Sequence, residues 1–175
     1  MVPNKQCAAS AAAFVLIVAG AAFGSAARAA DPDIPAPPNT TVAREVQAGG
    51  AQVYGCRQTP DGTYAWTLIG PDAVLIDADG TTFGTHAAGP TWTAADGSAI
   101  TADGAHPVVV VKRPGSVPAL LLNVNSSTGT GALSGVRFVR RWDTDGGVAP
   151  ATGCDAAHAN ARVAVHYSAV YTFYR

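Results

Sequence analysis

The central part of the chain alternates short apolar runs with Asp-Gly turns. Residues 51–57 (AQVYGCR) alternate in character, and Tyr64, Trp66 and Leu68 fall on one face of the next expected strand, because side chains in a strand repeat every two residues. Asp-Gly pairs occur at positions 61, 79 and 96, where glycine supplies the positive φ that a tight turn needs. The pattern predicts a series of β-hairpins between residues 51 and 100.

Strand patterns continue toward the C-terminus. Residues 108–111 (VVVV) and 119–124 (ALLLNV) are almost continuously apolar, which predicts strands buried on both faces. Residues 163–173 alternate, with His166 on the polar face, which predicts one core face and one solvated face. Helical composition is confined to the short stretch 156–161. We therefore predict an all-β fold, a single antiparallel β-sandwich or barrel of about nine short strands.

The first 29 residues have the pattern of a secretory signal peptide. Lys5 precedes an apolar run at residues 11–23, and small residues then lead to an Ala-Arg-Ala cleavage site. The run is shorter than the about 20 apolar residues that span a bilayer. We expect residues 1–29 to be a cleaved signal peptide, residues 30–45 a mobile proline-rich leader, and residues 46–175 the all-β domain. The mature protein is then secreted or periplasmic, without a membrane span.

The charge of the mature chain argues against nucleic-acid binding. Cleavage removes Lys5 and Arg28 but no acidic residue, which leaves nine basic and twelve acidic residues and a net charge of −3. Nucleic-acid binding needs clustered Lys and Arg side chains that displace counterions. The chain offers only two small basic groups, at 112–113 and 137–141. We expect no nucleic-acid partner.

Two cysteines remain after cleavage, Cys56 and Cys154. An even number of cysteines in an exported chain predicts a disulfide. The bond would join residues 98 positions apart, and the chain-entropy model gives such a bond about 4–5 kcal/mol. Two free buried thiols are the alternative, whereas a metal pair lacks a second close ligand.

Two motifs that would indicate an enzyme are incomplete or absent in this sequence. Residues 129–135 (GTGALSG) resemble a dinucleotide fingerprint, but the third glycine is one position late and no helix follows to receive a pyrophosphate. No G-x-S-x-G nucleophile elbow is present, and Ser98 fits a turn. We expect no cofactor.

His86 is the first candidate for chemistry. It lies at the end of an expected strand, opposite in face to Phe83, so we expect it to point away from the core and to be accessible. His166 on the polar face of the last strand is a possible partner, whereas His106 and His158 fit ordinary surface positions. No pair has the spacing of a known metal signature, so we assign no metal site.

The tryptophans extend this candidate site. Trp66 shares a face with two large apolar residues, which predicts burial in the core. Trp92 follows a Gly-Pro pair and is a candidate for an exposed ring that stacks on a sugar. We expect a ligand groove whose candidate residues are His86, Trp92, Asp96, Arg140 and Asp143.

Five stretches of the chain are similar to one known family. They are GAQVYGC (50–56), GTHAAGPTWTAADGS (84–98), GALSGV (131–136), RRWDTDGGVAPATGC (140–154) and VHYSAVYTFY (165–174). In this order they resemble a family of secreted bacterial and fungal proteins, catalogued as domain of unknown function 3455, over nearly all of the mature chain. The family implies no established activity. A dehydrogenase label that some fungal relatives carry finds no support here, because the cofactor fingerprint fails.

These observations favour a binding or structural role over catalysis. The expected partner is a carbohydrate or another component of the cell envelope, because the small net charge suits a neutral ligand. The first alternative is a metal-dependent hydrolase or oxidoreductase centred on His86. The second is an inhibitor of an envelope-degrading enzyme such as lysozyme.

Overall fold

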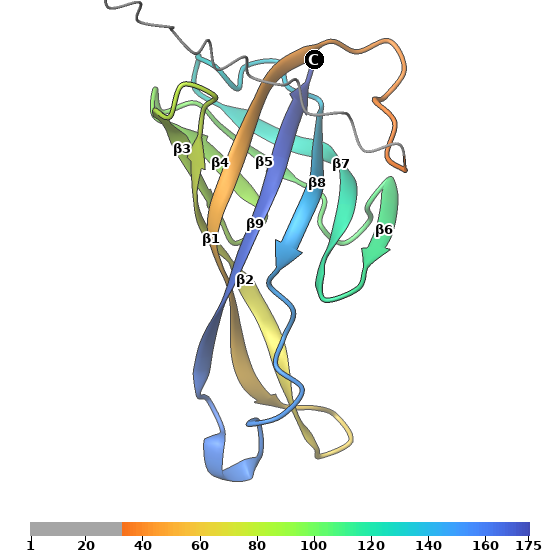
Figure 1. The fold of residues 1–175 in the computed structure, drawn as a ribbon, viewed down its shortest axis with the longest axis vertical. Helices are drawn as coiled ribbons and strands as arrows, with labels where there is room; N and C mark the ends of the chain where they lie inside the picture. Colours follow the sequence, from red (N-terminus) through yellow and green to blue (C-terminus); the bar gives the residue numbers. More distant parts are fainter. Residues whose placement is uncertain (1–32) are drawn as a thin grey trace, which may run out of the picture.

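The computed structural model describes residues 33–175, which form a ring of strands with a narrow extension at one end (Figure 1). The expected signal peptide lies outside the described residues. The elements are β1 (Val42–Gln58), β2 (Tyr64–Ile76), β3 (Thr82–Ala87), β4 (Thr91–Ala94), β5 (Ala99–Ala102), β6 (Val109–Arg113), β7 (Ser116–Thr128), β8 (Phe138–Gly146), the 3-10 helix η1 (Ala156–His158) and β9 (Arg162–Tyr174). Within this range, no helix has the length and apolar character needed to cross a membrane.

The nine strands of the described chain form one antiparallel sheet in the order β5-β4-β3-β2-β1-β9-β8-β7-β6. β5 also pairs with β7, with Ala99 opposite Thr128, so the sheet closes into a ring. β6 pairs with β7 outside this ring. The prediction of a single antiparallel all-β fold is confirmed, in its closed barrel form. Closure pairs the backbone groups that an open sheet would leave free at its edges.

Three strands extend beyond the ring. β1 has 17 residues and β2 and β9 have 13 each, more than twice a typical strand length. Figure 1 shows the lower parts of these strands leaving the ring together, with the β1–β2 turn and η1 at the far end. We call this extension, residues 53–69 and 147–165, the stalk. The predicted disulfide joins Cys56 and Cys154 in it.

Each of the three Asp-Gly pairs forms the predicted turn. Gly62, Gly80 and Gly97 have φ values of 86°, 84° and 85°. In each turn the preceding aspartate accepts hydrogen bonds from the backbone and side chain of a Thr or Ser two positions on. The same local chemistry therefore closes the β1–β2, β2–β3 and β4–β5 hairpins.

The interior of the ring holds the main hydrophobic core. Its largest buried side chains include Trp92, Tyr167, Tyr171, Phe173 and Leu75. A second, smaller cluster lies on the outer face of β7, where Ala119 and Leu121 pack with Ile34. The two clusters bury both faces of β7, as its apolar run predicted.

The segment before β1 packs on the ring, which differs from the expected mobile leader. Ile34 is fully buried, and its carbonyl accepts a 3.1 Å hydrogen bond from Arg140 Nη1. The carbonyl of Asn39 accepts a 3.0 Å bond from Arg137 Nη2. β1 then begins at Val42, four residues before the expected domain boundary. Proline prevents this segment from forming a helix but leaves it free to dock in an extended form. We call residues 33–41 the strap.

Two strands differ from their predicted burial. Val108–Val111 was expected to be buried on both faces, but β6 is at the edge outside the ring, and Val110 is 51% exposed. β9 was expected to have one solvated face. That description fits only its lower part, because Val170, Thr172 and Tyr174 on the second face are buried in the upper part. Neither outcome follows from alternation, because burial depends on which neighbours cover each face.

Candidate functional site

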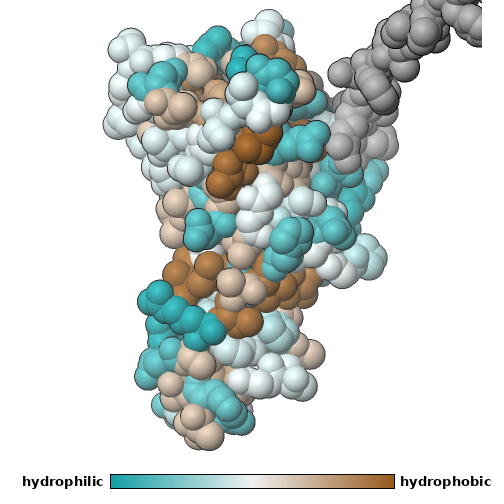
Figure 2. Space-filling model, turned by 60° about the vertical axis from the view of Figure 1, so that its left-hand side comes forward, coloured by the Kyte–Doolittle hydropathy of each residue, from teal (hydrophilic) through white to brown (hydrophobic). Residues whose placement is uncertain are grey.

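A cavity of about 520 Å³ lies in the ring at the end from which the stalk emerges. Its apolar wall comes from β2, β5, β7 and β8, and the β3–β4 turn and the β5–β6 loop border it. Exposed Leu68 and Ile69 of β2 continue this apolar surface to the outside. Figure 2 shows apolar surface gathered at this level, between the wider upper body and the stalk. The cavity therefore opens at the junction of ring and stalk.

His86 lines this cavity and is only 3% exposed, so the expectation that it points away from the core is wrong. The reason is a β-bulge. Leu75 pairs with Gly84 and Ile76 pairs with Thr82, which leaves Phe83 as an extra residue in β3. An extra residue shifts the two-residue period, so Phe83 and His86 are both buried although three positions separate them.

The imidazole of His86 is held in one orientation. Its Nδ1 lies 2.9 Å from the carbonyl oxygen of Thr91, and a carbonyl can only accept, so Nδ1 carries the proton. The ring stacks on Trp92 with centroids 4.3 Å apart and planes 7° apart. Burial lowers the pKa of His86 to about 4. His86 is therefore a neutral wall residue at pH 7.

Trp92 and Tyr171 form an aromatic side of the cavity with His86. Trp92 is 1% exposed and meets Tyr171 edge to face at 5.5 Å, so the prediction of an exposed stacking platform is wrong. Within the described residues, Trp92 Nε1 has no hydrogen-bond partner, whereas the Tyr171 hydroxyl interacts with that of Tyr167. The amide nitrogen of Gln52, another wall residue that is 2% exposed, also lacks a partner. Two buried N–H groups of one cavity wall are thus unsatisfied, which is unusual in a folded protein.

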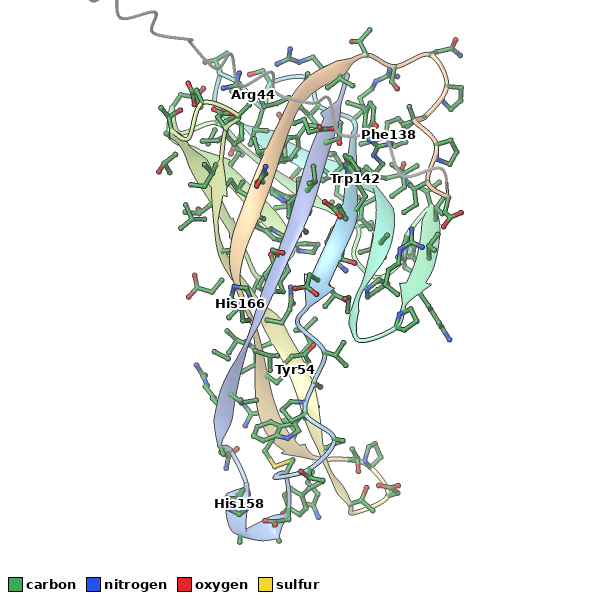
Figure 3. The ribbon with its side chains drawn as sticks, viewed as in Figure 1. Arg44, Tyr54, Phe138, Trp142, His158 and His166 are labelled. Carbon is green, nitrogen blue, oxygen red and sulfur yellow. A yellow bond between two sulfur atoms is a disulfide. The ribbon has the colours of Figure 1, made fainter. Side chains whose placement is uncertain are left out.

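The loop that follows β8 packs beside this wall. Tyr54 lies at the ring–stalk junction (Figure 3). Its hydroxyl donates a 2.6 Å hydrogen bond to the carbonyl of Gly147. Gly147 has a φ of 79°, and a Cβ there would lie 2.8 Å from Tyr167 Cβ and 3.0 Å from Gln52 Cγ. Only glycine fits this position without displacing Gln52 or Tyr167.

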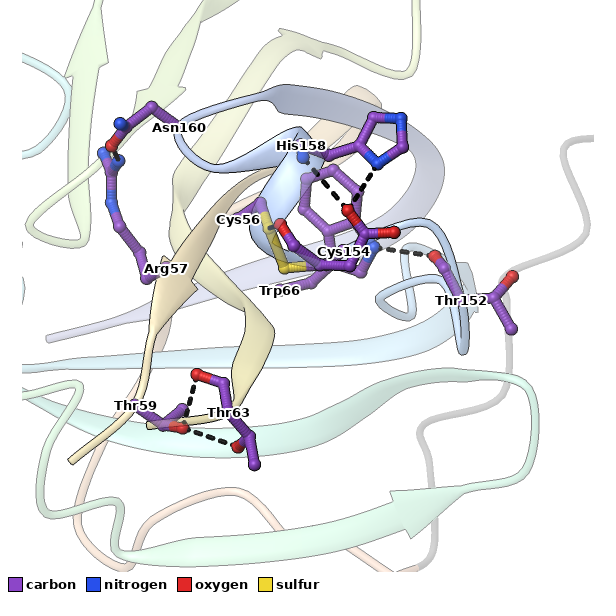
Figure 4. The surroundings of a disulfide bond; sticks show 10 residues. Cys56, Arg57, Thr59, Thr63, Trp66, Thr152, Cys154, His158 and Asn160 are labelled. Carbon is purple, nitrogen blue, oxygen red and sulfur yellow. Dashed lines mark hydrogen bonds and ion pairs between the residues drawn. A yellow bond between two sulfur atoms is a disulfide. The ribbon is translucent and has the colours of Figure 1, made fainter. Parts of the chain in front are cut away.

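The disulfide fastens the other end of the same loop to the stalk. Figure 4 shows Cys56 bonded to Cys154, with Trp66 Nε1 donating to the carbonyl of Thr152 over 2.9 Å. Trp66 is only half-buried here, so its predicted place in the core is wrong. It packs at the stalk because it pairs with Cys56 across the β1–β2 ladder.

Asp96 lies away from the cavity, at the β4–β5 turn. Its carboxylate accepts a 2.6 Å bond from the Ser98 hydroxyl and a 2.7 Å bond from the backbone N–H of Ala132. These bonds, the Ser98 hydroxyl first, hold the pKa of Asp96 below its usual range. Ser98 Oγ also accepts a bond from Leu133 N. These hydrogen bonds hold the β4–β5 turn (residues 95–98) against the loop at residues 131–135, so Asp96 and Ser98 have a structural role. Asp96 does not contact His86.

Arg140 lies on the outer face of the ring, so it does not join the cavity either. Its guanidinium is 5.0 Å from the ring centroid of Trp142, and its Nη2 donates to Thr172 Oγ1 over 3.3 Å. Thr172 in turn donates to Glu45 Oε2 over 2.7 Å. With the bond to Ile34, this network fastens the strap to the ring.

Asp143 and the remaining histidines are also separate from the cavity. Asp143 has a φ of 48° and is exposed at a bulge in β8, between the pairs Trp142–Val170 and Asp145–Ser168. His106, His158 and His166 are exposed. Across residues 33–175, no three His, Cys, Asp or Glu side chains are grouped so that they could hold a metal ion. The metal-dependent alternative thus has no ligand set around His86 in this part of the chain.

Of the five expected groove residues, the structure brings only His86 and Trp92 together. Gln52, Arg141 and Tyr171, which line the same cavity, were not among the residues expected from the sequence. The sequence does contain a signal for Gln52 and Arg141. Gln52 interrupts the inward series Val46, Ala48, Gly50 in β1, and Arg141 follows Val139 at the same period in β8. A polar residue in an inward series is a candidate site residue.

These features define a class of protein: a closed antiparallel β-sheet with one end open to a cavity and a disulfide-bonded stalk. The chain belongs to a family of proteins of unknown function (DUF3455), whose model matches residues 37–175. The resemblance inferred from the sequence is therefore confirmed. No curated protein and no solved structure matches the chain.

Proposed function

We propose that the protein is an exported binding protein that takes a small ligand into the cavity at the ring–stalk junction. The cavity volume of about 520 Å³ lies within the range of small-molecule sites, roughly 300–1,000 Å³. Its wall combines apolar side chains with a few polar ones, the usual composition of such sites. A cavity of this size favours a small molecule over a polymer.

One observation carries this proposal. Gln52 Nε2 and Trp92 Nε1 are buried in the wall without partners among the described residues. Leaving such a group unsatisfied costs about 1–3 kcal/mol. A ligand that comes within hydrogen-bond reach of these groups recovers part of that free energy, so a bound ligand would stabilise the folded protein.

The wall favours binding over catalysis. Its described residues include no Ser, Thr, Cys or Lys side chain, so the hydroxyl, thiol and amine nucleophiles of these residue types are missing beside His86. The Nδ1 of His86 is already bonded to Thr91, and its low pKa keeps the ring neutral. His86 then contributes a flat, uncharged ring.

Export is supported by two independent features. The first 29 residues have the pattern of a signal peptide. The Cys56–Cys154 disulfide is typical of proteins that reside in oxidising compartments. We propose that the ligand is met in the periplasm or outside the cell.

Calorimetric titration with a neutral apolar probe, octan-1-ol, tests the proposal. We expect saturable binding at one site per chain. Ala102 is buried and lines the cavity, so Ala102→Phe should fill it and abolish binding. Val74 is 45% exposed on a strand of the same ring, so Val74→Phe should leave binding unchanged. Absence of saturable binding of octan-1-ol and of every other apolar probe of this size, or equal binding of a probe by Ala102→Phe and the wild type, would refute the proposal.

A further inference from the structure

The buried polar atoms of the cavity wall that lack a partner among the described residues are hydrogen-bond donors. Gln52 Nε2 and Trp92 Nε1 can only donate. The carboxylate at the mouth is Asp103, and it is already occupied by the backbone N–H groups of Ala105 and His106 and by His106 Nδ1. A ligand that satisfies the wall must therefore bring acceptors.

Arg141 adds a positive charge to this wall. Its Nε donates a 3.0 Å hydrogen bond to the carbonyl of Pro118, which uses one of its five N–H donors. No carboxylate of residues 33–175 forms an ion pair with it, whereas Arg44, Arg113 and Arg140 each lie within 4 Å of one. The charge of Arg141 also opposes protonation of His86. The cavity thus holds one fixed cation, and an anion is the charge that suits it.

The rest of the wall is apolar. Leu68, Pro71, Leu120, Leu122 and Val139 line it. Burying a second charge against such side chains is costly without a second cation. A sugar is less suited, because its many hydroxyl groups would lose their hydrogen bonds to water against a largely apolar wall. The wall therefore limits the ligand to one charged group on an apolar body.

We propose that the cavity binds a small monocarboxylate, with the carboxylate at Arg141 and the unpartnered donors and an apolar chain or ring against the leucines. This rests on the proposed function, because it names the ligand class of the same site. At about 30 Å³ per water, the volume of about 520 Å³ corresponds to roughly 17 water molecules. Medium-chain fatty acids and phenylalkanoic acids fit within that space.

The test compares acids with their uncharged analogues on the purified protein. Calorimetric titrations with octanoate, 3-phenylpropanoate, octan-1-ol and octanedioate at pH 7.5 separate the classes. We expect octanoate to bind at least about tenfold more tightly than octan-1-ol, because a carboxylate adds charge-assisted hydrogen bonds. Octanedioate should bind at least about tenfold more weakly than octanoate.

Arg141→Gln removes the charge, and we expect it to weaken octanoate binding at least about tenfold and octan-1-ol binding by a much smaller factor. Arg137 is exposed and outside the cavity, so Arg137→Gln is the matched control and should change neither. Arg141→Lys keeps the charge and should retain part of the preference for the acid, which covers the case in which Arg141→Gln does not fold.

The outcomes distinguish this inference from the proposed function. If octan-1-ol binds and octanoate binds no better, or if Arg141→Gln binds octanoate as tightly as the wild type, the ligand class is wrong and the binding function stands. Equal binding of octanedioate would also overturn the single-charge class. If none of the probes binds, both proposals fail.

Discussion

At the scale of the residue, a β-bulge and a backbone carbonyl determine the burial and the tautomer of His86. The extra residue Phe83 brings His86 into the ring, and Thr91 fixes its tautomer. Stacking on Trp92 then makes the imidazole part of an aromatic wall. His166 on β9, labelled in Figure 3, is exposed to solvent instead.

Burial of His86 makes the stability of the protein depend on pH. Its pKa is lowered from 6.5 to about 4, so the unfolded chain takes up a proton on acidification before the native state does. The contribution of His86 is therefore complete above pH 6.5 and is lost as the pH falls to about 4, with a total of about 3 kcal/mol.

Urea unfolding at pH 7.5 and pH 4.5 measures this difference. His86→Gln should flatten the dependence in this window, and His166→Gln at the exposed position should not. An unchanged pH dependence in His86→Gln would show that other groups cause it.

At the scale of the element, the loop after β8 connects the cavity to the stalk. Gly147 at its start packs against Gln52 and Tyr167, and Cys154 at its end is bonded to Cys56. Tyr54 bonds the same glycine from β1. The RRWDTDGGVAPATGC stretch therefore has a structural role, since it closes the side of the wall that carries Gln52.

Gly147→Ala tests the close packing of this loop. We expect a loss of roughly 2–4 kcal/mol in the free energy of unfolding, because a positive φ costs about 1 kcal/mol and overpacking costs about 1–3 kcal/mol. Gly153 in the same loop has a φ of 84°, but a Cβ added there would meet no atom within 4 Å, so Gly153→Ala should cost only about 1 kcal/mol. Denaturant unfolding of both variants gives the comparison, and equal losses would contradict the packing argument.

At the scale of the whole molecule, the ring depends on contacts between distant parts of the chain. β5 and β7 close it, and the strap covers the outer face of β7. Arg140 joins the strap to β9 through Ile34 and Thr172. A polar network that the sequence suggested for a ligand groove is therefore used to hold the N-terminal segment on the ring.

Ile34→Ala tests the contribution of the strap. Ile34 is fully buried and packs with Ala119 and Leu121, so we expect a loss of about 2–4 kcal/mol in the free energy of unfolding. Val42 is 60% exposed, and Val42→Ala should change stability by less than about 0.5 kcal/mol. A loss below about 1 kcal/mol for Ile34→Ala would mean that the strap is not firmly docked in solution.

Local patterns predicted much of the fold. The Asp-Gly turns at Gly62, Gly80 and Gly97 formed as expected, because a positive φ and an Asx hydrogen bond depend only on residues within the turn. The strands follow from alternation for a similar reason, and the Cys56–Cys154 bond from the count of two cysteines.

The candidate site was predicted only in part. Alternation assigns side chains to the two faces of a strand, and that assignment is wrong beyond a bulge. The sequence alone determined most of the strands, the turns, the disulfide and the family. Tertiary structure alone decided that Phe83 and His86 share the interior, that Asp96 and Arg140 do not reach the cavity, and that Gln52, Arg141 and Tyr171 do. The physical reason is that a two-residue period says nothing about an inserted residue or about which strands close a ring, and only ring closure brings polar groups from β1, β8 and β9 to one cavity wall.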